Sequence, residues 1–532
     1  MKRLLSVTEA AGRSAVLYIA LSAGLLGFGI LRSARELVHA FDTGIYLQIL
    51  AGLKARGTFP SLAEWFTWPS SLTGEANFLA HHFQPVVGLL LPLYRLLPST
   101  EVLFIVSWLF LGLAAVLIGI RSASLRRAAA GGIDAPAGLM VDAFGPVFMC
   151  LFPACASRLY FGFAPDVMAI PALVLQAMVL NSLSGRSGGV ILMPPKPQEV
   201  WAGGLQAGPL AILIFIFAQL WAGACKEVFW VINAWVALVL AWRLNWLVQR
   251  RMALVALIWA LVQAGFFSWL FFQWMPANTS HTGYYGLNYL DFRLTALLQA
   301  NWARILELLF AAGFFAALLR PTWSLLLILP GLAIVVLGRY SQIQSPTALY
   351  PLAFAPFLAV ILAENLAVLQ GWRHRLTRLL CVAAIAAGVI LQAPLLFRST
   401  APAFKPAAKA LAIDLSVVKK SLPADAYLLV DGNLQPALHE WRDVRVILGF
   451  IGNPAPLEPA DFKRATDILT MFDIDKLGSC SEVKPDATDD WAARGVPFHD
   501  YDGFQRFCEW LRAMPRKKQV FADSGLVHYR LN

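Results

Sequence analysis

The chain has 532 residues, of which 58% are hydrophobic and only 14% are charged. Together with a mean hydropathy of +0.62, this composition excludes an ordinary soluble domain and indicates a polytopic membrane protein. The net charge of +11 does not indicate nucleic-acid binding. Most basic residues stand in short clusters at the ends of apolar runs, which is the positive-inside pattern of membrane proteins.

Apolar runs divide residues 1–398 into about eleven predicted transmembrane helices, since one span needs roughly 20 apolar residues. The predicted spans cover residues 15–34, 101–120, 139–157, 165–182, 207–225, 228–247, 252–274, 302–319, 322–338, 348–369 and 379–397. The apolar piece 86–97 is too short to cross and is expected to be re-entrant or interfacial. Lys2, Arg3 and Arg13 precede the first run, so we expect an inner (cytoplasmic) membrane protein with a cytoplasmic N-terminus.

Charges and turn residues become frequent after residue 398, so residues 399–532 are expected to form a small soluble α/β domain. Its predicted elements are strands at 427–431 and 444–448 and amphipathic helices at 406–420 and 461–472. An odd number of spans places this domain outside the cytoplasm, on the same side as the first outer loop, residues 35–100. Cys480 and Cys508 lie in this region, and an extracytoplasmic location would allow them to form a disulfide.

The first outer loop carries the residue that we single out, Asp42. It stands between Phe41 and Ile45 at the membrane boundary, where partial desolvation raises the pKa of a carboxylate and makes it a better base. The structural alternative is that Asp42 caps the start of an interfacial helix.

The same loop contains the adjacent histidines His81 and His82. Adjacent rings cannot easily face one metal ion from a helix, so the spacing does not favour a metal site. An imidazole here would suit a phosphate or pyrophosphate group, or it could simply hydrogen-bond to the interfacial backbone.

Two later outer turns also carry ionisable residues. Asp166 follows Phe163-Ala164-Pro165 and could share a site with Asp42 or bind a cation. Lys226 and Glu227 stand between two spans, where exposure to lipid is costly, so they face the protein interior, water or each other.

Aromatic and basic residues at other outer positions complete the candidate set. Tyr284 and Tyr285 lie in a loop rich in Asn, Gly and hydroxyl side chains, a composition that suits sugar binding. Arg339 and Tyr350 stand at outer helix ends, where the arginine could meet a lipid-linked phosphate.

Several of these motifs resemble a family of predicted prokaryotic membrane proteins known as the domain of unknown function 2079. The motifs are Phe41-Asp42-x-Gly-Ile-Tyr-x-Gln48, Asn77-Phe78-x-x-His81-His82-Phe83-x-Pro85 and Pro92-Leu93-Tyr94, with later similar blocks at 163–171, 226–227, 321–330 and 345–356. The resemblance extends over about residues 15–400. That family is similar in layout to glycosyltransferases of the GT-C architecture, which have many spans, a catalytic Asp in the first outer loop and often a soluble outer domain.

The resemblance implies a cell-envelope glycosyltransferase that moves a sugar from a polyprenyl-phosphate donor to an extracytoplasmic acceptor. Asp42 would be the base, and Arg339, Lys226 or His82 would neutralise the leaving phosphate, which is usually the larger catalytic contribution. No motif requires a cofactor, and Asp166 could instead position a divalent cation. The alternatives are a transporter or channel lined by Asp42 and Lys226, or a scaffold that presents residues 400–532.

Overall fold

The structure of the protein is a computed structural model. It describes residues 2–34, 41–55, 79, 82–129, 139–160, 162–183, 209–246, 249–275, 294–337, 350–369, 371–403, 406–430, 434–438, 441, 443–446, 459–470, 501–521 and 524–531.

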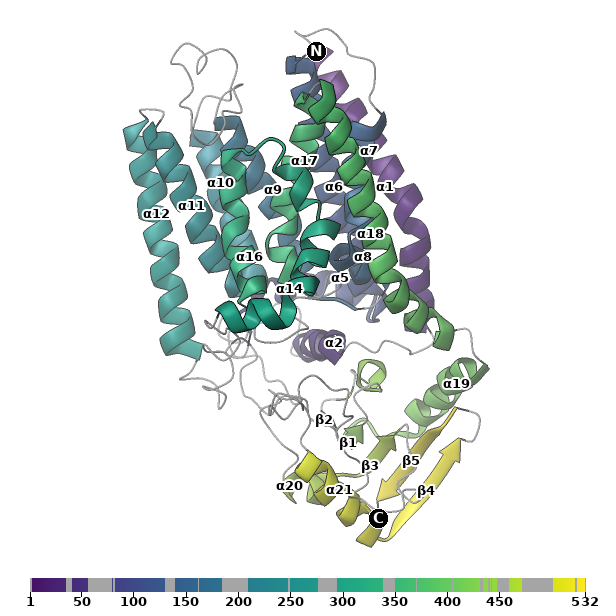
Figure 1. The fold of residues 1–532 in the computed structure, drawn as a ribbon. Coiled ribbons are helices and arrows are strands. Elements are labelled where there is room, and N and C mark those ends of the chain that lie inside the picture. The colour runs from purple at the N-terminus through teal and green to yellow at the C-terminus, as the bar shows by residue number, and fades with distance from the viewer. Residues whose placement is uncertain are drawn as a thin grey trace.

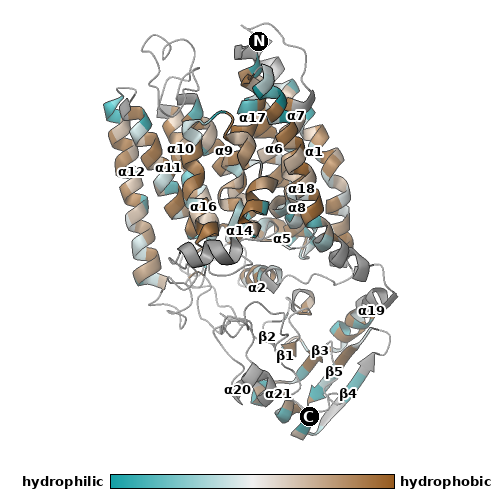
Figure 2. Ribbon diagram, viewed as in Figure 1, coloured by the Kyte–Doolittle hydropathy of each residue, from teal (hydrophilic) through white to brown (hydrophobic). Residues whose placement is uncertain are grey.

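The long apolar helices form a bundle and run roughly side by side between its two ends (Figure 1). Hydrophobic residues dominate their length, whereas the sheet beyond one end is mixed in character (Figure 2). The helices of this part are α1 (Lys2–Ala34), α6 (Glu101–Ala129), α7 (Leu139–Leu151), α8 (Pro153–Tyr160), α9 (Asp166–Leu183), α10 (Pro209–Cys225), α11 (Val228–Trp246), α12 (Arg250–Trp269) with the π-helical turn η2 (Leu270–Trp274), α14 (Leu294–Ala311), α15 (Phe314–Ala317), η4 (Trp323–Ile328), α16 (Leu329–Val336), η6 (Tyr350–Ala353), α17 (Ala355–Val368) and α18 (Gly371–Ala403).

Within the described residues, four helices are long and apolar enough to cross a membrane: Thr8–Leu31, Glu101–Arg126, Arg250–Trp274 and Gly371–Pro394. A fifth span results if α7 and α8, which are bent by 66° at a break, count as one. Pro153 begins α8 and has no N–H to continue the α7 hydrogen-bond ladder, which explains the break. Most other predicted spans coincide with shorter apolar helices, so the chain is a multi-pass membrane protein, and the count of eleven stays a prediction.

The centre of the bundle is α17, whose residues Ala355–Leu366 are all buried. A helix that is hydrophobic all round belongs in the interior of a bundle, and α17 packs against α6, α9 and α18.

A network of buried amides joins α9, α10, α11 and α12. The Asn233 side chain accepts a hydrogen bond from Gln176 and donates one to the Gln219 carbonyl, and Gln219 Nε2 donates to the Asn233 carbonyl. Gln219 Oε1 in turn accepts from Trp259 and Gln263 of α12. Hydrogen bonds of this kind hold transmembrane helices together where no hydrophobic driving force acts between them.

The helix α2 (Phe41–Ala55) lies across the end of the bundle opposite the N-terminus, between the bundle and the sheet (Figure 1). It packs against η1 (Pro85–Leu90) and α5 (Leu91–Leu96), the short helical piece predicted at 86–97. From the other side it contacts η7 (Gln435–Leu438), which belongs to the C-terminal region. The helix therefore connects the bundle to the C-terminal region, and we call this the α2 end of the bundle.

The C-terminal region contains a five-stranded sheet in the order β2-β1-β3-β5-β4. Strand β1 is parallel to β2 and β3, whereas β5 is antiparallel to β3 and β4. The strands are β1 (Tyr427–Val430), β2 (Asp443–Val446), β3 (Asp467–Thr470), β4 (Arg516–Phe521) and β5 (Leu526–Leu531), and the helices are α19 (Pro406–Ser421), α20 (Pro459–Arg464) and α21 (Tyr501–Ala513).

One face of this sheet packs against α19 and η7, and the other against α20 and α21. The predictions of both strands and of the helix at 406–420 are correct to within two residues. The helix predicted at 461–472 is wrong in its second half, because the chain leaves α20 at Arg464 and enters β3. Residues Ile468 and Leu469 are buried on opposite faces of the sheet, which only an extended chain allows.

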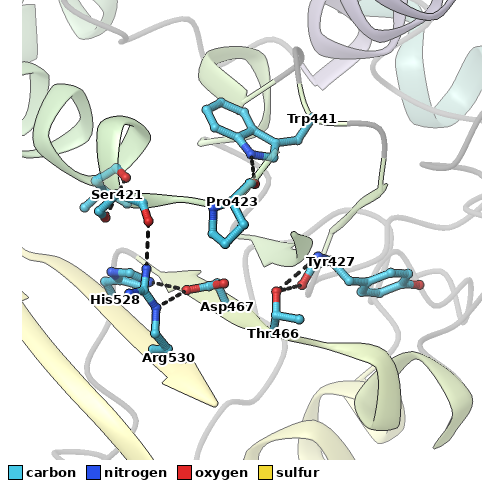
Figure 3. A network of polar contacts seen from close by, with 9 residues as sticks. Ser421, Pro423, Tyr427, Trp441, Thr466, Asp467, His528 and Arg530 are labelled. Atoms are coloured by element: carbon cyan, nitrogen blue, oxygen red, sulfur yellow. Dashed lines mark hydrogen bonds and ion pairs between the residues drawn. The ribbon is translucent and has the colours of Figure 1, made fainter. Parts of the chain in front are cut away.

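Asp467 is the centre of a polar network at this sheet (Figure 3). Its Oδ1 lies 2.8 Å from His528 Nε2 and accepts a hydrogen bond from Arg530 Nε at 3.0 Å, while Arg530 Nη2 donates to the Ser421 carbonyl. Burial would raise the pKa of Asp467, but the hydrogen bonds from His528, Arg530 and Thr466 hold it below its usual value. The network joins β3, β5 and the end of α19.

Cys508 of α21 is disulfide-bonded. Cys150, Cys155, Cys225 and Cys381 are free thiols, and Cys480 lies outside the described residues.

Candidate functional site

A hydrogen bond connects the N-terminal turn of α2 to the segment that precedes α9. Thr43 Oγ1 accepts a hydrogen bond of 3.1 Å from the backbone N–H of Phe163, and both residues are buried. Asp42 immediately precedes Thr43, so its Cα lies about 3.8 Å from that of Thr43. The backbone of Asp42 therefore lies beside the 162–166 segment, while its side chain is outside the described ones.

Asp42 lies in the first turn of α2, which begins at Phe41. The helix that the structural alternative expects is therefore present, but it begins one residue before Asp42, so Asp42 stands inside its first turn and not at the N-cap. This position suits a general base, because the helix dipole favours an ionised carboxylate in the first turn, and a base must be ionised to accept a proton.

Tyr46, one turn further along α2, connects the same helix to two more segments. Its hydroxyl donates to Gln84 Oε1 at 3.0 Å, and its ring meets the Phe163 ring edge-on at 5.5 Å between centroids. Tyr46, Gln84 and Phe163 are all buried. Helix α2, the residues around Gln84 and the segment before α9 thus form one packed unit.

Lys226, in the two-residue turn between α10 and α11, pairs with Asp166 at the start of α9. The Nζ–Oδ1 distance is 3.3 Å, and the two side chains are 13% and 6% exposed. Lys226 Nζ also lies 5.6 Å from the centroid of the Tyr350 ring. Burial lowers the pKa of Lys226, but Asp166, Tyr350 and Glu227 raise it above its ordinary value, so the ammonium group stays charged.

Glu227, the next residue in the turn, pairs with His82. The distance from His82 Nδ1 to Glu227 Oε1 is 3.3 Å, with side chains 24% and 8% exposed. Burial would raise the pKa of Glu227, but His82 and Lys226 hold it below its usual value. Lys226 and Glu227 therefore do not form the mutual pair considered as one alternative. Each is paired with a residue from another segment.

The structure thus brings together five of the ten residues singled out in the sequence, namely His82, Asp166, Lys226, Glu227 and Tyr350. They form one set of contacts at the α2 end of the bundle, together with the backbone of Asp42. His81, Tyr284, Tyr285 and Arg339 lie outside the described residues.

Two residues of this site were not singled out from the sequence as functional, Thr43 and Gln84. Both stand at unspecified positions (x) of the motifs quoted for the family resemblance, so no signal in the sequence singled them out. Their role depends on partners in other segments, at positions 163 and 46.

The site offers a cation, two carboxylates, an imidazole and a phenol within one partly buried cluster. Such a set can stabilise a developing negative charge and orient hydroxyl groups. Across the described ranges no group of three or more His, Cys, Asp or Glu side chains is arranged to hold a metal ion.

A comparison with curated proteins gives no match. A family model described as "Predicted membrane protein (DUF2079)" matches residues 34–184. The match includes Asp42, His82 and Asp166, and it confirms the resemblance over this part of the chain.

The fold is similar to that of ArnT from Cupriavidus metallidurans. A crystal structure of that protein in the apo state aligns over 97% of both chains, with a TM-score of 0.50 and 12% sequence identity. A second structure, with undecaprenyl phosphate bound, aligns over the same share of both chains with a TM-score of 0.46 and 12% identity. Residues 34–184 thus match the DUF2079 family model, and the chain is a multi-pass membrane protein with an ArnT-like fold.

Proposed function

We propose that this protein is an integral membrane glycosyltransferase that moves a sugar from a polyprenyl-phosphate donor to an extracytoplasmic acceptor. One observation carries the proposal. A hydrogen bond joins the first turn of α2, which contains Asp42, to the segment before α9, and Asp166 at the start of α9 forms an ion pair with Lys226. This arrangement supports the proposal because the backbone of the candidate base lies next to the segment that carries Asp166, the counter-charge of the buried Lys226. The ArnT-like fold supports the general class.

In the proposed reaction Asp42 removes the proton from an acceptor hydroxyl. The acceptor oxygen forms a bond to the anomeric carbon from the side opposite the phosphate, so that the configuration inverts. The bond between the anomeric carbon and the phosphate oxygen breaks, and its electron pair leaves with the phosphate. Lys226, with Arg339 or His82, stabilises that charge, while the proton remains on Asp42.

The proposal includes a division of the chain into a membrane domain, residues 1–398, and an extracytoplasmic α/β domain, residues 399–532. The N-terminus would then be cytoplasmic and the α2 end of the bundle would face outward. The contact of η7 with α2 supports a position of the outer domain directly over the site.

The test compares wild type with Asp42→Asn, both purified in detergent with native lipid and incubated with a panel of polyprenyl-phosphate sugars. Undecaprenyl phosphate is a reasonable carrier to begin with, because ArnT from Cupriavidus metallidurans has been solved with it bound. We expect wild type to release free polyprenyl phosphate and Asp42→Asn to release at least 100-fold less, the scale of a positioned general base.

Asp425→Asn serves as the matched control, since Asp425 is exposed in the turn between α19 and β1. It should keep wild-type activity. Equal activity of wild type and Asp42→Asn would refute the role of Asp42. Failure of wild type to consume any donor would refute the proposed function and leave transport or scaffolding as the alternatives.

A further inference from the structure

Three buried polar atoms at the candidate site have no hydrogen-bond partner among the described residues. They are Asp166 Oδ2, Glu227 Oε2 and Gln84 Nε2, and all three residues are at least nine-tenths buried. Buried polar groups in folded proteins almost always have a partner, so each such atom calls for an explanation. A bound ligand would supply these partners.

The three atoms belong to one connected set of residues. Asp166 pairs with Lys226, Glu227 is the next residue and pairs with His82, and Gln84 is two residues beyond His82. Among the described residues, the side chain of Gln84 has one hydrogen bond, which it accepts from Tyr46. Whichever way its amide is turned, one of its two polar atoms remains for another partner.

The charges decide which chemistry fits. Glu227 is ionised, because His82 and Lys226 keep its pKa low, and an ionised carboxylate only accepts hydrogen bonds. Asp166 already receives a charged partner from Lys226 on its other oxygen. Two unpaired acceptor oxygens repel a phosphate group placed directly against them, so the phosphate does not bind at these two oxygens. Groups that both donate and accept hydrogen bonds, as sugar hydroxyls do, match two acceptors and one amide.

We propose that Asp166, Glu227 and Gln84 bind the hydroxyl groups of the transferred sugar and so form the specificity-determining part of the site, separate from its phosphate-binding part. This inference rests on the proposed function, since it assumes that the ligand is a lipid-linked sugar. It assigns recognition of the sugar to the turn between α10 and α11 and to the segment before η1.

The experiment measures equilibrium binding to the full-length protein in nanodiscs. The probes are undecaprenyl phosphate and a panel of undecaprenyl-phosphate hexoses and pentoses, with the monodeoxy analogues of the sugar that binds best. The measured quantity is the ratio of the affinity for the sugar-bearing lipid to that for undecaprenyl phosphate. We expect wild type to prefer one sugar-bearing lipid, and Glu227→Gln and Gln84→Leu each to reduce the ratio about tenfold or more, the loss expected for a hydrogen bond to a charged or buried group.

The matched control is Glu364→Gln, another buried carboxylate of the bundle, which pairs with Arg121 and Asn181. Arg121 lies 20 residues into α6 from Glu101, about 30 Å along that helix. This variant should keep the wild-type ratio. The deoxy analogues need no variant, and at least one of them should bind wild type about tenfold more weakly than its parent.

The outcomes separate the two proposals. If wild type binds undecaprenyl phosphate but shows no preference for any sugar-bearing lipid, the inference is overturned and the proposed function survives. The inference is also overturned, and the proposed function survives, if the variants lower the affinities for undecaprenyl phosphate and for the sugar-bearing lipid equally. The residues would then have a structural role. If wild type binds neither kind of lipid, the proposed function and the inference both fail.

Discussion

The buried ion pair between Lys226 and Asp166 allows a quantitative test of the central contact of the candidate site. At an effective dielectric constant of about 20, two unit charges 3.3 Å apart attract by about 5 kcal/mol. The cost of burying both charges offsets much of this, and removal of one partner from a buried pair typically destabilises a protein by about 3–5 kcal/mol. We therefore expect Lys226→Met to lower the free energy of unfolding by about 3 kcal/mol.

A double-mutant cycle isolates the interaction itself. Asp166→Asn should cost a comparable amount, because it leaves Lys226 buried without its counter-charge. The double variant should lose much less free energy of unfolding than the two single variants lose together, since two uncharged side chains leave no buried charge without a counter-charge. We expect a coupling energy of about 2–3 kcal/mol.

The assay is reversible unfolding in mixed micelles of increasing SDS content, followed by fluorescence of the 18 tryptophans. Lys420→Met is the matched control, since Lys420 lies exposed on α19 and its loss should change stability by about 0.5 kcal/mol or less. A coupling energy below about 0.5 kcal/mol would show that the two charges do not form a buried pair, and the proposed site would lose its central contact.

Three further predictions concern contacts around and beyond the site. Thr43→Val should lower the free energy of unfolding by about 1–3 kcal/mol and reduce turnover, because the buried Phe163 N–H loses its acceptor. Thr43→Ser keeps the hydroxyl and should have the stability and turnover of wild type. Thermal unfolding measures the first effect and donor consumption the second. Asn233→Leu should destabilise the bundle by about 1–2 kcal/mol, since hydrogen bonds between transmembrane helices contribute on average about 0.6 kcal/mol each, and an unchanged SDS midpoint would contradict this. The lowered pKa of Asp467 stabilises the fold fully above its unfolded value of about 3.9, and this contribution is lost as the pH falls through the folded value. Asp467→Asn should therefore lower the Tm at pH 7, and the difference from wild type should shrink as the pH falls through the folded pKa of Asp467. Equal Tm values at pH 7 would exclude a stabilising role for the pair with His528.

The sequence alone predicted most of the apolar helices and two of the five strands, β1 and β2. Spans such as 228–247 and strands such as 427–431 depend on local runs of hydrophobic residues, and burial of those runs is required in any arrangement of the chain. The same reasoning predicted that polar residues such as Asp166 and Lys226 stand at helix ends. It failed at 461–472, where the local pattern suited a helix but the sheet required a strand.

Only the tertiary structure decided which of these polar residues meet. Glu227 could have paired with its neighbour Lys226, but helix packing brings it to His82, 145 residues away in the chain. The hydrogen bond that fastens α2 through Thr43 likewise joins segments 120 residues apart. Such contacts are fixed by how the helices pack, and the packing depends on the shapes of all the buried side chains together, which no local pattern encodes.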